Sequence, residues 1–354
     1  MLQRPGAFVP KMLMLWTIMV CMTSSLRARD FPPQEESAAA SDDWVQPARP
    51  FRSADAGSEA SGVWRLNDVP RSDDGGFVQP AGFREGMLFD PNAPYIEGAP
   101  DISEPGPDMG DFPNSAYTLK KGRSYVEFSP ATYSARNNNN AATFSTPFLL
   151  RYGVTDDVEF RLIGNGITTV SDPTPSTGVG VLIFDTKIHM WEEKMEYFIP
   201  AASFEAFLQT DLGSPVYQSG TQPSVNINMD FPFTDDTNLE LTVGYSGSLM
   251  TVAFLRGAPL PPDVNRRGAM EIPVNTYTFS LQWALEQEIT DQFQLFLHGY
   301  YNQPIESPYG ASVVVGTGFF YELNQRTIFF GSLNAGLSDI PAPIQGQFGL
   351  ALAF

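Results

Sequence analysis

Cysteine and histidine are scarce in this chain of 354 residues. The single cysteine, Cys21, lies in a segment that we expect to be removed. A mature chain without cysteine has no disulfide framework, no thiol nucleophile and no thiolate metal site. The only two histidines, His189 and His298, are not accompanied by a recognisable nucleophile motif. The sequence therefore predicts no catalytic residues, no metal site and no cofactor, and we expect the protein not to be an enzyme.

Positive charge is also scarce. The chain has 21 Lys and Arg residues against 40 Asp and Glu residues, a net charge of -19 that offers nothing to attract a nucleic-acid backbone. Charged residues make up only 17% of the chain, whereas aromatic residues reach 13% and Gly and Pro number 30 each. Few charges combined with many aromatic and turn-forming residues are typical of an all-β protein with a large apolar surface.

Long apolar runs are missing from most of the chain. The run at residues 12–22 is too short for a spanning helix, which needs about 20 residues. Because Arg4 and Lys11 precede it and small residues follow it, residues 1–28 are predicted to be a secretory signal peptide. We expect the mature chain to contain no membrane-spanning helix.

Residues 29–116 are rich in Pro, Gly, Ser, Asp and Glu and poor in β-branched residues. Such a composition buries too little apolar surface to offset the entropy lost on ordering. This acidic segment is therefore predicted to be disordered.

The pattern changes to a side-chain period of two in the remainder, residues 117–354, which is the signature of β-strands. At residues 224–231, for example, Val, Ile, Met and Phe alternate with Ser, Asn and Asp. Many of the segments have about ten residues, the length that a tilted strand needs to cross a bilayer. Twelve strands are predicted at residues 123–132, 143–152, 157–169, 179–191, 197–209, 223–233, 237–250, 273–287, 291–302, 310–323, 326–338 and 345–354.

The predicted connections alternate between long and short along the whole sequence. An up-and-down antiparallel transmembrane β-barrel has this asymmetry, with tight turns on the periplasmic side and longer loops outside. An even number of strands places both ends of the chain on the periplasmic side, and with them residues 29–116. The five short connections lie near residues 154–156, 192–196, 234–236, 288–290 and 324–325.

Three features favour a barrel in the outer membrane over a soluble barrel. The polar strand faces carry mostly small or uncharged residues, where a water-facing surface would have more Lys and Glu. Aromatic residues such as Tyr152, Phe231 and Phe293 lie near strand ends, which suits the two membrane interfaces. The last strand ends on Phe354 and resembles the signal by which outer-membrane proteins engage the barrel assembly machinery. The predicted partners are therefore outer-membrane lipid and this machinery.

Residues 150–161, LRYGVTDDVEFR, form the most specific motif of the sequence. Together with residues 117–128 and the segment Asp185-Thr186-Lys187, this motif resembles the family of outer-membrane transporters named after the meta-pathway of phenol degradation. The resemblance covers about residues 117–354. It implies an outer-membrane barrel with a role in transport, and it transfers no binding residues to this chain.

If the apolar strand faces contact lipid, the charged residues between them point into the lumen, because a charge on the lipid face costs about 2–4 kcal/mol near the midplane. They could form a charged constriction that selects solutes, or a mutually paired network that closes the interior. A twelve-stranded lumen is wide enough to be open and narrow enough to be filled. The lumen candidates are Glu127, Arg151, Glu159, Arg161, Asp185, Lys187, His189, Glu240 and His298.

The sequence as a whole predicts a channel or transporter for the passive passage of small solutes, hydrophobic ones among them. The alternative is a barrel that conducts nothing and serves a structural or surface-binding role. An outer-membrane hydrolase is the less favoured third class, because it would need a nucleophile beside a histidine or another base.

Overall fold

The structure is a computed structural model, and it describes residues 88–137, 141–171, 175–255, 258–259, 270–304 and 310–354. The predicted signal peptide, residues 1–28, lies outside these ranges and stays a prediction. Within the described part of the chain, no helix is long and apolar enough to span a membrane. The described residues include two single-turn 3₁₀ helices, Met195–Tyr197 and Pro215–Tyr217.

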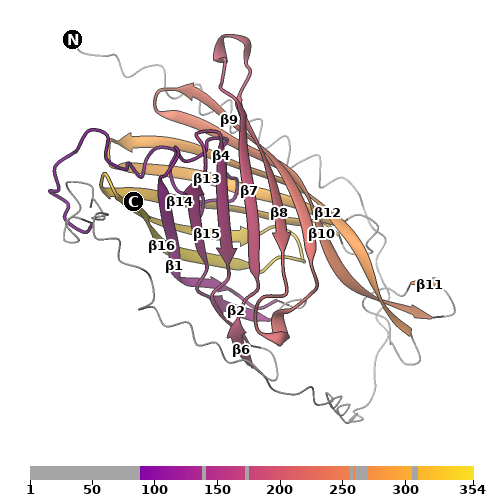
Figure 1. Ribbon diagram of the computed structural model, residues 1–354. Helices are drawn as coiled ribbons and strands as arrows, with labels where there is room; N and C mark the ends of the chain where they lie inside the picture. Colours follow the sequence, from indigo (N-terminus) through magenta and orange to yellow (C-terminus); the bar gives the residue numbers. More distant parts are fainter. Residues whose placement is uncertain (1–87, 138–140, 172–174, 256–257, 260–269, 305–309) are drawn as a thin grey trace, which may run out of the picture. The chain divides into compact units, whose positions relative to one another are not determined.

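Twelve antiparallel strands form a closed barrel (Figure 1). Each strand pairs with the next one along the chain, and the last pairs with the first, for example Ala353 with Tyr125. The predicted twelve-stranded antiparallel barrel is therefore confirmed. The strands are β1 (Ser124–Ser134), β3 (Phe148–Gly153), β4 (Val158–Gly164), β7 (Leu182–Trp191), β8 (Ala201–Gln209), β9 (Gln222–Thr234), β10 (Thr237–Leu255), β12 (Met270–Thr290), β13 (Phe293–Pro304), β14 (Ser312–Asn324), β15 (Thr327–Gly336) and β16 (Ile344–Ala353).

Four shorter strands extend the sheet outside this ring: β2 (Ala142–Ser145), β5 (Ile167–Ser171), β6 (Ser176–Val179) and β11 (Ala258–Pro259). The two long strands predicted at 143–152 and 157–169 are thus each interrupted. Pro147, which separates β2 from β3, has no N–H to donate to a neighbouring strand. Gly166, which separates β4 from β5, has φ +55° and lies so close to the Thr146 carbonyl that a Cβ would clash with it.

The connections follow the predicted asymmetry with one exception. Turns of two to four residues join β3 to β4, β9 to β10, β12 to β13, and β14 to β15, and longer segments make the connections at the other end. The connection from β7 to β8, predicted to be short at 192–196, spans residues 192–200 and includes the 3₁₀ helix Met195–Tyr197. We call the two ends of the barrel the short-turn end and the long-loop end. Ser124 and Phe354 exchange backbone hydrogen bonds, so β1 starts and β16 ends at the short-turn end.

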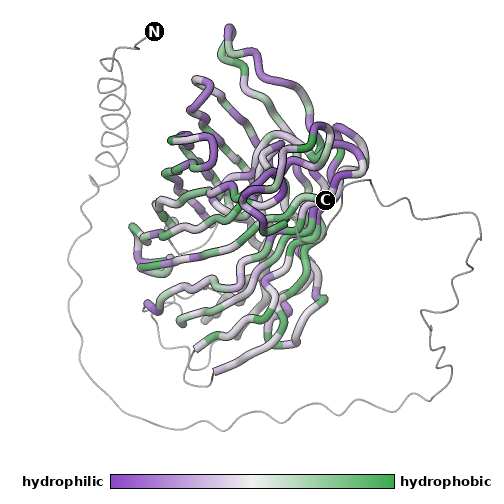
Figure 2. Tube along the Cα trace, turned by 90° about the vertical axis from the view of Figure 1, so that its left-hand side faces the viewer, coloured by the Kyte–Doolittle hydropathy of each residue, from purple (hydrophilic) through white to green (hydrophobic). Residues whose placement is uncertain are grey.

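Strand alternation places apolar side chains outside and most charged ones inside. Leu150 and Leu297 are 39% and 37% exposed, whereas their neighbours Arg151 and His298 are 2% and 0% exposed. Hydrophobic and hydrophilic residues recur along the strands accordingly (Figure 2). An outward apolar face is suited to contact with lipid. Closure of the barrel is a separate requirement, because it leaves no strand edge with unpaired backbone groups.

Residues 88–122, which we call the plug, run from the short-turn end into the barrel. Residues 88–101 are mostly exposed and lie against the β14–β15 turn, where the Ile96 N–H donates to Gln325 at 2.9 Å, whereas residues 102–119 enter the lumen. Ile102 and Leu119 of the plug are fully buried in one cluster with wall residues that include Phe296 and Phe330. The structure therefore corrects the prediction of disorder for residues 88–116, while residues 29–87 lie outside the described ranges. Composition indicates how much apolar surface a segment can bury against itself. It does not include the apolar wall residues against which Ile102 and Leu119 are buried.

Candidate functional site

Asp108 of the plug is the centre of a buried ionic cluster. Its Oδ2 atom lies 2.8 Å from Lys187 Nζ, 3.2 Å from Arg161 Nη2 and 3.5 Å from Arg151 Nη1. The three cations come from adjacent strands, β7, β4 and β3, and antiparallel pairing sets Arg151 opposite Arg161. All four side chains are nearly inaccessible to solvent.

Four wall carboxylates complete this cluster, and each pairs with a cation that also contacts Asp108. Arg151 binds Glu159 through two nitrogens, at 2.6 and 3.1 Å, and Glu127 at 3.2 Å. Arg161 forms ion pairs with Glu205 and, at 3.2 Å, with Asp185. Because the charges are desolvated, each one depends on its partners, and removing one partner leaves an uncompensated buried charge.

The charge state of Asp108 follows from these contacts. Burial by itself would raise the pKa of the Asp108 carboxyl, but Arg151, Lys187 and Arg161 hold this pKa below its usual range. Asp108 therefore stays ionised, and it joins the plug to the wall as a charged group.

Further hydrogen bonds fix the plug around the barrel. Its Met109 N–H donates to Glu127 on β1 at 2.8 Å, and Gln347 on β16 donates to the Met109 carbonyl at 2.6 Å. On the opposite side, Asn114 donates to Glu205 on β8 at 2.9 Å, and Ser115 donates to Asp230 on β9 at 2.9 Å. The plug is thus held mainly by polar contacts that reach strands all round the lumen.

Both histidines contact the plug. His298 is buried, stacks on Phe112 with a centroid distance of 4.2 Å, and shares a hydrogen bond of 2.6 Å with Asn334. His189 Nδ1 lies 3.0 Å from the Ala116 carbonyl oxygen, and the His189 ring stacks on Tyr117. Each imidazole therefore holds a plug residue in place.

The structure brings six of the nine predicted lumen residues into the cluster around Asp108. The six are Glu127, Arg151, Glu159, Arg161, Asp185 and Lys187. His189 and His298 contact other parts of the plug, and Glu240 lies in a separate group of carboxylates. The cluster has the geometry of a mutually paired network, and a role of these residues in selecting solutes stays a prediction.

Sequence reasoning missed the plug side of the site, namely Asp108, Asp111, Phe112 and Asn114. The segment has no strand or helix period, so no pattern marks these residues among the many other acids of residues 29–116. The available signal was electrostatic. Strand parity predicts three lumen cations on adjacent strands beside wall carboxylates, and it gives no information on a partner from outside the wall.

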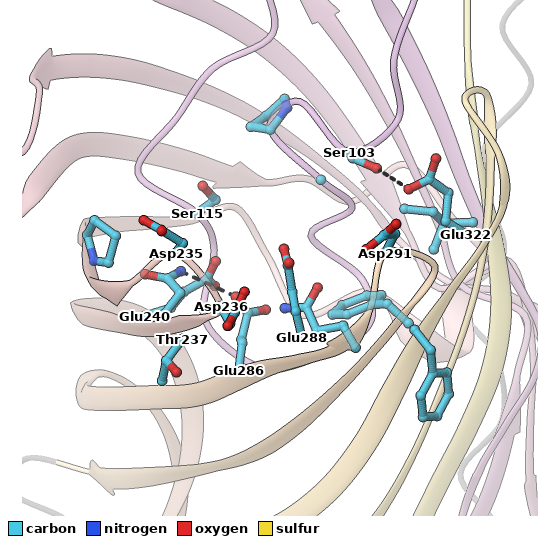
Figure 3. Close-up of a pocket in the computed structure, with 18 of the residues that line it drawn as sticks. Ser103, Ser115, Asp235, Asp236, Thr237, Glu240, Glu286, Glu288, Asp291 and Glu322 are labelled. Atoms are coloured by element: carbon cyan, nitrogen blue, oxygen red, sulfur yellow. Dashed lines mark hydrogen bonds between the residues drawn. The ribbon is translucent and has the colours of Figure 1, made fainter. Parts of the chain in front are cut away.

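Cavities lie near each end of the lumen. One, of about 400 Å³, is bordered near the short turns by the exposed acids Asp235, Asp236 and Asp291 (Figure 3). The other, of about 370 Å³, is lined by uncharged polar side chains that include Gln209, Gln222, Asn226, Gln282 and Asn302. These residues lie toward the long-loop end, and we call this second cavity the vestibule. The plug therefore fills the lumen between the short-turn end and a polar vestibule.

No protein-family model matches the chain, and no curated protein sequence matches it. The resemblance of residues 150–161 to the family of outer-membrane transporters therefore stays a prediction. Several solved structures of outer-membrane barrels are similar to this chain in fold, at low sequence identity.

An outer membrane channel from Pseudomonas putida F1 aligns with 9% identity and a TM-score of 0.47, over 68% of this chain and 99% of its own. The NanC porin aligns with 8% identity and a TM-score of 0.43, over 66% and 99% of the two chains. The toluene transporter TbuX of Ralstonia pickettii aligns with 10% identity and a TM-score of 0.32, over 66% and 89%. All three TM-scores are below 0.5, so the function proposed for this chain rests on its own residues.

Proposed function

We propose that this protein is an outer-membrane channel for the passive passage of small solutes, and that the plug closes it at rest. The outward apolar face of the strands supports the membrane location, since side chains such as Phe160, Leu150 and Leu297 are substantially exposed around the barrel. We place the short-turn end and the plug on the periplasmic side, in line with the turn asymmetry of membrane barrels.

The observation that carries this proposal is how the lumen is filled. In small barrels the wall's own side chains fill the interior, and such an interior cannot be emptied. Here a separate segment fills it through ion pairs and hydrogen bonds with a polar wall. When the segment moves, water can enter the lumen and hydrogen-bond to the polar wall groups that the segment had covered. A polar wall behind a removable plug is the arrangement of a channel.

The vestibule indicates the solutes. Its amide and hydroxyl groups can bind small neutral solutes without a net charge to repel either sign. Ile183 and Phe207 also border it, which gives hydrophobic solutes an apolar surface. We therefore propose small uncharged molecules as the solutes.

The second candidate is a barrel that conducts nothing and serves a structural or surface-binding role. The number of buried contacts that hold the plug favours it, because a plug fixed this firmly could remain in place permanently. The two functions differ in whether the plug leaves the lumen.

Replacing Asp108 by Asn should raise the open fraction of the channel. The substitution keeps the shape of the side chain but removes the charge that three wall cations share. In planar bilayers we expect rare openings from the wild type and frequent openings from Asp108→Asn.

Asp90→Asn is the matched control, because Asp90 is an exposed plug acid whose side chain caps only Asn92, and its openings should resemble those of the wild type. Heat-dependent gel mobility would show that each variant forms a barrel. If the wild type and Asp108→Asn both fold as barrels and neither shows conductance steps, the result would favour a barrel that conducts nothing.

A further inference from the structure

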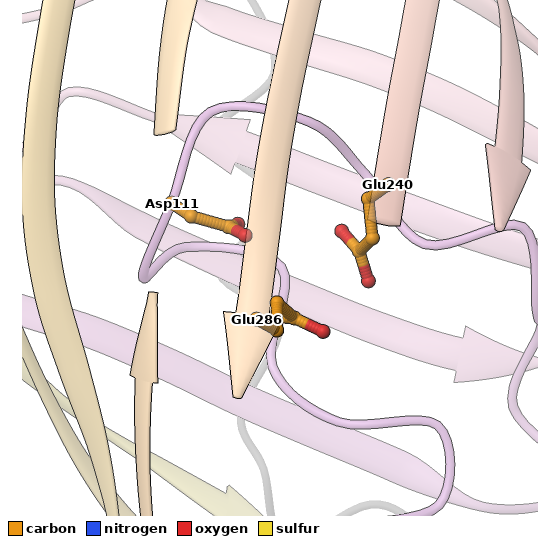
Figure 4. A group of neighbouring side chains, drawn as sticks. All are labelled: Asp111, Glu240 and Glu286. Atoms are coloured by element: carbon orange, nitrogen blue, oxygen red, sulfur yellow. The ribbon is translucent and has the colours of Figure 1, made fainter. Parts of the chain in front are cut away.

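A second group of carboxylates joins the plug to the wall, and it differs from the cluster around Asp108. Asp111 of the plug, Glu240 of β10 and Glu286 of β12 each place an oxygen within 4.8 Å of the others (Figure 4). The register explains the wall side of the group. Glu240 lies opposite Ala284, so Glu286, two residues further along, shares its lumen-facing side. Asn238 lies directly opposite Glu286 and donates to it at 3.3 Å.

A buried oxygen without a hydrogen bond lies next to this group. Asp230 is only 2% exposed and is the cross-strand neighbour of Glu240 on β9. Its Oδ2 atom accepts hydrogen bonds from Ser115 and Ala116, whereas its Oδ1 atom has no hydrogen-bond partner. Asn238 Oδ1 and Asp111 Oδ2 are buried oxygens that also have no partner. Asp230, Asn238, Glu240 and Glu286 border the same cavity of about 400 Å³.

The described residues supply no paired counter-charge here, and Lys187 acts on Asp230 only from beyond ion-pair distance. Among the described residues, no ion pair reaches Asp111, Asp230, Glu240 or Glu286, although Asp108 has three cationic partners. Several carboxylates that converge without a cation repel one another strongly in a buried site. A bound cation removes this repulsion and also gives the unpaired oxygens a partner.

We propose that these residues form a calcium site that ties the plug to the wall. The donors are carboxylate and amide oxygens only, which is the ligand set of hard divalent cations. Ca²⁺ binds oxygens at about 2.3–2.6 Å, so ligands on opposite sides of the ion are about 5 Å apart, which suits the observed spacing. Mg²⁺ needs shorter distances and a stricter octahedron, and it should bind more weakly. The exposed acids Asp235, Asp236 and Asp291 near the cavity would attract the ion from solution.

Such a site would regulate the opening of the channel by the plug, a consequence that rests on the proposed function. Asp111 is the only ligand from the plug, whereas Asn238, Glu240 and Glu286 belong to the wall. Bound calcium would therefore add a connection that must break before the plug moves. Calcium should lower the open fraction of the channel, and a chelator should raise it.

The test is calorimetric titration of the full-length protein in detergent with calcium chloride, after treatment with a chelator. We expect saturable binding that Glu286→Gln weakens by at least about tenfold, as the loss of a charged ligand should. Glu288→Gln, which neutralises an exposed acid two residues along the same strand, should bind calcium nearly as the wild type does. Magnesium chloride should compete only at much higher concentration.

Absence of saturable binding would overturn the inference, as would a folded Glu240→Gln/Glu286→Gln double variant that binds calcium like the wild type. The result is independent of conduction, since no bilayer is needed. Calcium binding by a protein that shows no conductance would support the site and contradict the channel. Openings in bilayers by a protein that does not bind calcium would support the channel and contradict the calcium site.

Discussion

Deletion of residues 88–116 is expected to convert a mostly closed barrel into a steadily conducting one. The deletion removes Asp108, Asp111 and Asn114 with most of the plug, and it leaves residues 117–122 to lead into β1. The wall then encloses an interior between the filled eight-stranded barrels and the open sixteen-stranded porins, so the mean current should rise by at least about tenfold. Single-channel recording of the purified variant in planar bilayers measures this effect.

The barrel must survive the deletion for this result to be informative. All inter-strand pairs lie outside the deleted segment, because β1 starts at Ser124 and the ring closes between β1 and β16. Heat-dependent gel mobility therefore serves as the control for folding. A folded deletion variant whose current equals that of the wild type would show that the plug does not limit passage.

Replacement of Arg151 by Ala is expected to produce the largest loss of stability. Arg151 contacts Asp108, Glu127 and Glu159, and it is 2% exposed. Its removal leaves the two glutamates buried with one cation fewer, and breaking a buried pair in this way costs about 3–5 kcal/mol. Equilibrium unfolding in urea, with the protein in detergent or lipid, measures the free energy.

Lys120→Ala is the matched control for this loss. Lys120 also pairs with a glutamate, Glu104, at 3.1 Å, but the two side chains are 72% and 68% exposed. An exposed pair contributes about 0–1 kcal/mol, since water screens its attraction and two long side chains lose freedom. Equal losses in the two variants would contradict a stabilising role that depends on burial.

The sequence predicted the barrel because its strands carry a strong local signal. Alternation in a segment such as residues 224–231 determines which side chains face in, and Gly153 to Asp156 form the expected tight turn between β3 and β4. The interruptions by Pro147 and Gly166 were missed, although both residue types are known to break strands. The apolar–polar alternation continues on both sides of Pro147 and Gly166, so each pair of short strands has the sequence pattern of one long strand.

The lumen site was predicted only in part, for a physical reason. Parity along each strand places Arg151, Arg161 and Lys187 on the inner face without any knowledge of what fills the lumen. The partner that joins them, Asp108, lies 43 residues before Arg151 in a segment without periodicity. Long-range pairing of this kind depends on the closed barrel, and it leaves no mark in the local sequence.

A reversible disulfide lock tests most directly whether movement of the plug opens the channel. The Asn114 N–H donates to Thr242 Oγ1 at 3.2 Å, so cysteines at these two positions would be near enough for a disulfide between plug and wall. The variant is Asn114→Cys/Thr242→Cys, and the two new cysteines are the only thiols expected in its mature chain, because Cys21 lies in the predicted signal peptide. Recorded in planar bilayers, the oxidised form should show no openings, and reduction should restore them in the same membrane. Openings that continue unchanged in the fully oxidised form would contradict the account.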